Sequence, residues 1–239
     1  MKDCSKRMLV DGAKVYNVSI DDGMVELFER YSSLLLEWNE KVNLTAITEE
    51  EDIAIKHYID SLSIIPHIPL DASNFIDIGT GAGFPSIPVK IARKDLDVTM
   101  VDSLNKRVLF LEEVIKSLKM EKIRALHGRA EELGQDPGHR ELYDVVAARA
   151  VASLNVLLEY CLPFVKVGGV FIAMKGSDTD EVSEASKALD VLGGRIEHIH
   201  ETVLPFSDIK RNIIIIKKFR QTPTTYPRKP GKPLKQPLI

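Results

Sequence analysis

From Asn74 onward, short apolar strand patterns alternate with helical patterns, and this alternation constrains the fold more than any other feature. The predicted strands cover 75–79, 97–102, 123–127, 143–148, 169–175, 197–204 and 211–219, and the predicted helices cover 84–94, 105–119, 153–165 and 179–192. Nearly continuous apolar strands in regular alternation with helices are typical of a parallel sheet with helices on both faces. No helical pattern separates the last two strands, so we expect an antiparallel pair there. The sequence predicts an α/β fold with seven strands.

Two helical patterns precede the first strand. They cover 24–42 and 50–65, and Asp21 and Asp22 are suitable N-cap residues for the first of them. We therefore expect residues 1–70 to form an N-terminal helical cap that is not an independent domain, and residues 71–220 to form the core. Residues 221–239 are basic and proline-rich, which predicts an extended C-terminal tail.

A glycine turn follows the first strand. The stretch from Asp77 to Gly83 reads D-x-G-x-G-x-G, and Asp102 ends the next strand. Glycine lets a ligand approach the backbone, and a carboxylate at the end of the second strand can accept hydrogen bonds from ribose hydroxyls. Phe84 stands where a dinucleotide site would need its third glycine, so the spacing disfavours a pyrophosphate cofactor. The turn indicates an adenosine-like ligand, with a glycine turn that binds nothing as the alternative.

Composition excludes several other classes of protein. Apolar residues make up 44% of the chain and charged residues 28%, as in ordinary globular proteins. The two cysteines, Cys4 and Cys161, favour neither a disulfide framework nor a metal site, and we expect no metal. The sequence contains no signal peptide and no membrane-spanning stretch, which favours a cytoplasmic protein without a membrane partner.

The charge is unevenly distributed along the chain. Residues 210–239 contain nine basic and no acidic residues, so the rest of the chain carries −12 to give the net charge of −3. A basic end on an acidic body indicates a phosphate-rich partner such as RNA. A tail that only improves solubility is the equally weighted alternative.

Strings along nearly the whole chain carry a family resemblance. They are the W-N and N-L-T strings near residue 40, H-x-x-D-S from His57, the glycine turn, D-S at 102–103, G-R-A-E at 128–131, R-A-V-A at 149–152, K-G at 175–176 and Y-P-R-K-P-G-K-P at 226–233. Together they resemble the bacterial 16S rRNA guanine-N7 methyltransferases, also called glucose-inhibited division protein B or ribosomal RNA small subunit methyltransferase G. Ser86 departs from the family, which usually has a glycine there, and we expect little loss from this change.

The resemblance implies a Rossmann-like class I S-adenosylmethionine-dependent methyltransferase, with a seven-stranded, mostly parallel sheet and an antiparallel last strand. With the positions of the motifs at the strand ends, it assigns cofactor binding to Asp77, Gly79, Gly81, Gly83, Phe84, Asp102, Ala130, Glu131 and Arg149. Substrate or RNA contacts are expected from His57, Asp60, Lys106, Arg107, Arg211, Arg228 and Lys229. Structural alternatives stay open for several of these: a salt bridge for Arg149, capping for His57 and Asp60, and a solvated helix start for Lys106 and Arg107.

The absence of two known motifs narrows the choice of the atom that accepts the methyl group. Amino-group methyltransferases have a [DNS]-P-P-[YFW] element after the fourth strand and cytosine-C5 enzymes have a Pro-Cys nucleophile, whereas residues 144–149 here read D-V-V-A-A-R. Methylation of guanine N7 needs neither element, because the N7 lone pair is already nucleophilic and lies on the exposed edge of the base. The enzyme must mainly hold the reactants in line. We therefore assign no catalytic residue.

The expected reaction is methyl transfer from S-adenosylmethionine to N7 of a guanine in 16S rRNA, in the 530 loop of the decoding region by family resemblance. The expected partner is 16S rRNA, the small ribosomal subunit or its precursor, and we expect a monomer. Two alternatives from other classes are a non-catalytic RNA-binding ribosome assembly factor and a small-molecule methyltransferase.

Overall fold

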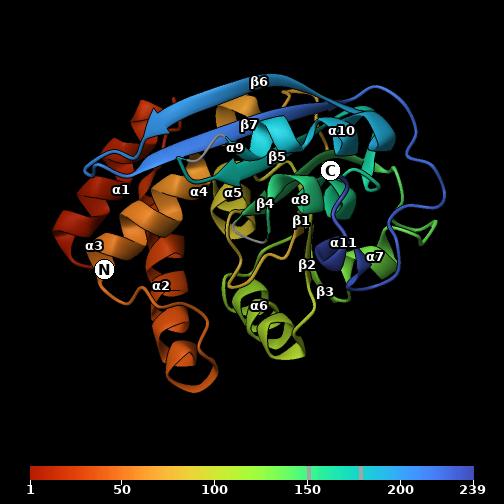
Figure 1. Cartoon of the computed structure of the whole chain (residues 1–239). Coiled ribbons are helices and arrows are strands. Elements are labelled where there is room, and N and C mark those ends of the chain that lie inside the picture. The colour runs from red at the N-terminus through yellow and green to blue at the C-terminus, as the bar shows by residue number, and fades with distance from the viewer. Residues whose placement is uncertain (150–151, 178–179) are drawn as a thin grey trace.

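A computed structural model describes residues 1–149, 152–177 and 180–239, and its centre is one seven-stranded sheet (Figure 1). The strands are β1 (Asn74–Ile78), β2 (Asp97–Asp102), β3 (Ile123–His127), β4 (Tyr143–Arg149), β5 (Val165–Lys175), β6 (Gly194–Val203) and β7 (Lys210–Lys218). All seven predicted strands are present, with ends that differ by a few residues. β5 begins four residues earlier than predicted, and the helix that was expected to run to residue 165 ends at Cys161.

The strands lie in the order β3-β2-β1-β4-β5-β7-β6. The first five pair in parallel, and β7 pairs antiparallel with both β5 and β6. The predicted mostly parallel sheet with an antiparallel last strand is therefore confirmed. Because β1 lies between β2 and β4, the chain reverses its direction of winding at β1, and ligands of open α/β sheets bind at such a switch point.

Helices cover both faces of the sheet. One face packs against the N-terminal helices together with α5 (Ser86–Ala92) and α6 (Asn105–Ser117). The other face packs against α8 (Leu154–Cys161) and α10 (Ser186–Leu192), with α7 (Ala130–Leu133) at its edge. Alternate residues of β7 point to the two sides, Ile213 and Ile215 into one core and Ile214 and Ile216 into the other. This double burial explains the continuous apolar strands.

The N-terminal cap begins with a helix that the sequence did not reveal. α1 (Asp3–Val15) buries Ser5, Leu9, Gly12 and Ala13. Only one of these side chains is a large hydrophobe, so the apolar pattern was too weak to predict a helix. Cys4 lies in this helix and is exposed.

The remaining cap helices follow the predicted pattern more closely. α2 (Asp22–Val42) begins where expected, and the Asp21 carboxylate caps it by accepting a 2.7 Å hydrogen bond from the Met24 N–H. The helix predicted for 50–65 consists of α3 (Glu50–Ile53), a π-helical turn η1 (Ala54–Ile59) and α4 (Asp60–Leu62), followed by the short η2 (Ile65–His67). π-Helical turns occur often at functional sites.

Two further regions differ from the predicted helices. The pattern over 179–192 corresponds to α9 (Asp180–Glu184) and α10, and its first residue lies outside the described part of the chain. The tail contains a short helix, α11 (Lys232–Lys235), next to α7 and α8. In the part of the chain that the structure describes, no helix has the length and apolar character needed to cross a bilayer.

Gly12 offers a test of how α1 packs. A Cβ at this position would lie 2.4 Å from Ile59 Cδ1 and 2.9 Å from Ile59 Cγ1, so α1 approaches η1 closely. We expect Gly12→Val to lower the free energy of unfolding by about 1–3 kcal/mol through overpacking, as measured by urea denaturation. Gly23→Ala, in an open part of α2, is the control and should leave stability unchanged or slightly increased. Equal stability of Gly12→Val and the wild type would contradict this packing.

Candidate active site

The glycine turn connects β1 to α5 at the carboxyl edge of the sheet. Gly79, Gly81 and Gly83 have φ angles of 73°, 63° and 96°, which side chains with a Cβ rarely adopt. A Cβ on Gly83 would lie 2.5 Å from Ile87 Cδ1, whereas the space beside Gly81 is open within 4 Å. The Tyr31 hydroxyl, from α2, donates a hydrogen bond to the carbonyl of Ala82. The cap therefore supports the turn from one side and leaves Gly81 open on the other.

Asp102 ties the turn to the end of β2. Its buried carboxylate accepts hydrogen bonds from the Gly81 N–H at 3.0 Å and the Leu104 N–H at 2.9 Å. Arg107, which was expected at the RNA, pairs with the same carboxylate at 3.2 Å. Lys106 is exposed at the start of α6. The structure thus places Arg107 beside the predicted cofactor residue and leaves Lys106 open to solvent.

A cavity of about 160 Å³ opens at this sheet edge. It brings together four residues predicted for the cofactor, Gly79, Asp102, Ala130 and Glu131. Ala130 and Glu131 belong to α7, which begins immediately after β3, so the G-R-A-E string lies where the parallel strands end. Tyr160 of α8 also lines the cavity, although nothing in its sequence context distinguished it from a core residue.

Asp77 is fully buried beneath the turn. Its Oδ2 accepts a hydrogen bond from the Ser86 hydroxyl, and its Oδ1 has no hydrogen-bond partner among the described residues. The Ser86 hydroxyl also lies 2.9 Å from Thr80 Oγ1. Burial raises the pKa of Asp77 to about 7, although the hydrogen bonds from Ser86 and Thr80 act in the opposite direction. Ser86, expected to matter little, is therefore a direct partner of the most buried carboxylate at the site.

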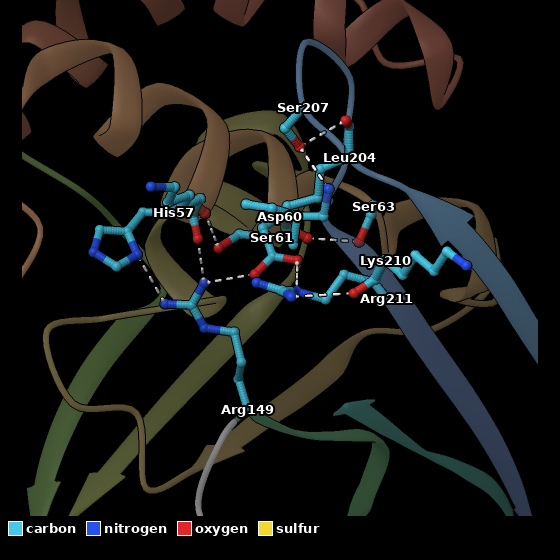
Figure 2. A network of polar contacts seen from close by, with 11 residues as sticks. His57, Asp60, Ser61, Ser63, Arg149, Leu204, Ser207, Lys210 and Arg211 are labelled. Atoms are coloured by element: carbon cyan, nitrogen blue, oxygen red, sulfur yellow. Dashed lines mark hydrogen bonds and ion pairs between the residues drawn. The ribbon is translucent and has the colours of Figure 1, made fainter. Parts of the chain in front are cut away.

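A second polar cluster adjoins the turn, and Figure 2 shows its members. The buried Asp60 carboxylate accepts from Arg149 Nη1 at 3.0 Å and from Arg211 Nε at 3.1 Å. Arg149 comes from the end of β4 and Arg211 from β7, and both reach toward the helix that carries Asp60. These residues line a cavity of about 370 Å³. Ala150 and Val151, the middle of the R-A-V-A string, lie outside the described residues.

His57 is held by contacts on both ring nitrogens. Its Nδ1 lies 3.3 Å from Arg149 Nη2 and its Nε2 lies 2.9 Å from Thr45 Oγ1. Because a guanidinium only donates, Nδ1 accepts and a neutral ring carries its proton on Nε2. Burial, together with Arg149, lowers the pKa of His57 to about 3. His57 is therefore neutral at physiological pH.

Phe84 packs against two members of this second cluster. Its ring stacks on His57 at 4.3 Å between centroids, and Arg149 Cζ lies 5.0 Å from its centroid. Phe84, predicted to cover the cofactor, thus packs against members of the second cluster. The structure assembles His57, Asp60, Arg149 and Arg211 in one network, whereas the sequence had assigned Arg149 to the cofactor and the others to the substrate.

The two predicted RNA residues of the tail lie in different environments. Arg228 pairs with Glu159 on α8 at 2.6 Å, and Lys229 is exposed. Lys56 and Lys175 line the larger cavity and were not predicted as site residues. Lys56 lies outside the family strings, so no sequence signal indicated it. Lys175 belongs to the K-G string, and that string could have indicated it as a site residue.

Comparison with models of protein families identifies the family of this chain. The model of the rRNA small subunit methyltransferase G family matches residues 24–214. The chain belongs to this family. The protein of that name from Acetivibrio thermocellus is 59% identical over 98% of this chain and 96% of its own. Its counterpart from Alkaliphilus metalliredigens is 54% identical over 98% of this chain and 99% of its own.

Solved structures agree on the fold. The crystal structure of M. jannaschii TYW2 in complex with AdoMet matches with a TM-score of 0.50 and 15% identity, covering 62% of this chain and 70% of that one. The enzyme is an S-adenosylmethionine-dependent rRNA methyltransferase with the Rossmann-like fold, as predicted. The predicted cofactor is likewise confirmed.

The described residues fit this cofactor. The Asp77 Oδ1 is a buried acceptor without a partner, which suits a cationic group. The Asp102 carboxylate lines the smaller cavity and accepts from the Gly81 N–H, and a carboxylate in this place suits the hydroxyl groups of a ribose. S-adenosylmethionine contains both a ribose and a positively charged amino-acid part.

Asp60→Asn tests the ion-pair network. An asparagine oxygen can still accept from one guanidinium, but the charges of Arg149 and Arg211 would lose their buried counter-charge. We expect the free energy of unfolding to fall by about 3 kcal/mol, as measured by chemical denaturation. Asp52→Asn removes the partly exposed pair with Lys56 and should cost less than about 1 kcal/mol. A similar loss in both variants would show that the Asp60 network contributes no more than a surface pair.

Proposed function

We propose that this enzyme transfers the methyl group of S-adenosylmethionine to N7 of a guanine in 16S rRNA, in the 530 loop by family resemblance. The observation that best supports N7 as the acceptor is the pairing of the ionisable side chains in the larger cavity. Its one carboxylate, Asp60, is neutralised by two arginines, and both nitrogens of His57 are engaged. No free general base therefore lines this cavity in the described residues. Methylation at N7 requires none, because the acceptor is already a lone pair.

The same cavity supports recognition of a guanine nucleotide. Guanidinium groups donate to O6 of guanine and to phosphate oxygens, which leaves the N7 lone pair free for the methyl group, and Arg149 and Arg211 supply two guanidinium groups. Lys56 and Lys175 also line the cavity, and they pair with Asp52 and Glu181 respectively. Because the target base must leave its stack to enter a pocket, the substrate is an accessible loop nucleotide.

Cofactor binding is assigned to the glycine turn and the strand ends around it. The cofactor supplies an electrophilic methyl group on a sulfonium. Asp77 offers its carboxylate to the cationic part, Asp102 offers hydrogen-bond acceptors to the ribose, and Ala130 and Glu131 form the adenine side of the cavity. Gly79, Gly81 and Gly83 allow close approach of the backbone. Phe84 and Arg149 are assigned to the cofactor as well, and both contact His57, which lines the larger cavity.

RNA backbone contacts are assigned to exposed basic residues. Lys106, Lys210 and Lys229 are exposed and form no ion pair with another described residue, so their charges are free to neutralise phosphates. We propose that the enzyme acts on the rRNA, the small subunit or its precursor in the cytoplasm, and that it is a monomer and needs no metal. Arg228 instead pairs with the buried carboxylate of Glu159.

Methyl mapping tests the reaction. Labelled S-adenosylmethionine and small subunits that lack the modification should yield label at N7 of one guanine in the 530 loop. Subunits that already carry the modification are the control and should incorporate none. Label in another base, or at another position of guanine, would falsify the proposed acceptor.

The pH dependence of cofactor binding tests Asp77. With a pKa of about 7, its carboxyl is protonated below that pH and becomes a carboxylate above it, so S-adenosylmethionine should bind more tightly as pH rises from 6 to 8. Calorimetry in buffers of different ionisation enthalpy should detect proton release near pH 7 that is absent in Asp77→Asn. The cofactor's own ionisation is common to both proteins and cancels in the comparison.

Ser86→Ala provides the matched variant for this experiment. The serine hydroxyl donates to the Asp77 carboxylate and lowers its pKa, so its removal should shift the transition in cofactor affinity to higher pH. An unchanged transition in Ser86→Ala, or an undiminished one in Asp77→Asn, would mean that another group titrates.

A further inference from the structure

The C-terminal tail, residues 221–239, is held against the body of the enzyme. The Arg140 guanidinium donates to the carbonyl oxygens of Thr222 at 2.7 Å and Tyr226 at 2.8 Å. The Gln135 side-chain amide donates to the carbonyl of Pro227 at 2.9 Å. Arg140 also donates to the carbonyl of Gly134, directly after α7, at 2.8 Å. These contacts attach the first half of the tail to the segment that follows α7.

Arg228 joins the tail to α8. Its guanidinium binds Glu159 in a two-point arrangement, with Nε to Oε1 at 2.9 Å and Nη2 to Oε2 at 2.6 Å. Its backbone N–H donates to the same carboxylate at 2.8 Å. The Glu159 side chain is 1% exposed, so the pair is buried on the carboxylate side. Two parallel N–H to oxygen bonds are a strong and strongly oriented contact that lysine cannot reproduce.

Gly231 joins the tail to α7. Its backbone N–H donates to Glu131 Oε1 at 2.9 Å, and the Glu131 carboxylate lies in the wall of the smaller cavity. Tyr160, the neighbour of Glu159, lies in the same wall. The two tail contacts therefore reach the two helices that form one side of this cavity (Figure 1).

We propose that the C-terminal tail is a positioning element of the cofactor site, in which Arg228 and the Gly231 N–H hold α8 and α7 in place around the adenine side of the cavity. This inference rests on the assignment of Glu131 to the cofactor in the proposed function. α7 has only four residues, so its own backbone bonds cannot hold Glu131 rigidly. Contacts from outside the helix must fix the carboxylate.

The environment of Arg228 separates this role from RNA binding. Its side chain is 17% exposed, and its Nε and Nη2 already donate to Glu159. Nη2 also donates to the carbonyl of Gln236, which closes the turn around α11. The exposed lysines of the tail, Lys229, Lys232 and Lys235, carry its charge to the surface instead.

Arg228→Lys in the full-length protein tests the proposal, because it keeps the charge and removes the two-point contact. We expect the Kd for S-adenosylmethionine, measured by calorimetry, to rise about tenfold, as for the loss of a hydrogen bond to a charged group. Amide hydrogen exchange in residues 130–134 should become faster. Lys235→Ala removes one exposed charge from the same tail and should leave both quantities unchanged. Thermal unfolding of each variant establishes that it is folded.

Arg228→Leu and Glu131→Ala complete the design. Arg228→Leu should weaken cofactor binding at least as much as Arg228→Lys, and Glu131→Ala should weaken it directly. If both folded Arg228 variants keep wild-type cofactor affinity and Glu131→Ala loses affinity, the proposed role of the tail is wrong and the cofactor assignment of Glu131 stands. Wild-type affinity in Glu131→Ala would overturn the cofactor assignment on which the inference rests. Neither result depends on which base of the rRNA is methylated, so the acceptor is tested separately.

Discussion

The Asp60 carboxylate holds together three parts of the enzyme that are far apart in sequence. It lies on the cap helix α4 and receives Arg149 from β4 and Arg211 from β7. A buried carboxylate is costly unless it is paired and hydrogen-bonded, and two buried-edge arginines have the same requirement. The cap therefore has to sit over the carboxyl edge of the sheet. That position also brings His57 and Tyr31 to Phe84 and the glycine turn.

The two cavities differ in how their charges are arranged, and this difference separates their chemical roles. At the smaller cavity, Asp102 is held by backbone N–H groups and by Arg107. Beneath the glycine turn beside it, Asp77 keeps an acceptor without a partner among the described residues. This is a site for a cation and for hydroxyl donors. At the larger cavity the single carboxylate is outnumbered by arginines, so the surroundings suit an electron-rich base and its phosphates. Phe84 follows the glycine turn and stacks on His57, which lines the larger cavity.

The basic end of the chain illustrates how charge in the sequence can mislead about function. Nine basic residues after Asp208 indicated an RNA-binding segment. In the structure, Arg211, Lys218 and Arg228 bind carboxylates of the body, and Lys218 is completely buried beside Glu141. Charge composition cannot separate a lysine on the surface from one that compensates an acidic residue inside. Only the exposed part of this segment, including Lys210 and Lys229, is available to RNA phosphates.

The sequence by itself determined the order of the strands along the chain, the glycine turn, the carboxylate at the end of β2 and the family. Each of these is a local pattern, set by the period of burial or by the φ angles that only glycine adopts easily. It did not reveal α1, whose buried face is mostly small residues, or the role of Ser86, whose partner Asp77 is nine positions away. Only the tertiary structure decided that Arg149 joins His57, Asp60 and Arg211, and that the tail meets Glu131 and Glu159. Those contacts span from 69 to 151 residues of sequence, and partners at such separations leave no periodic signal in the chain.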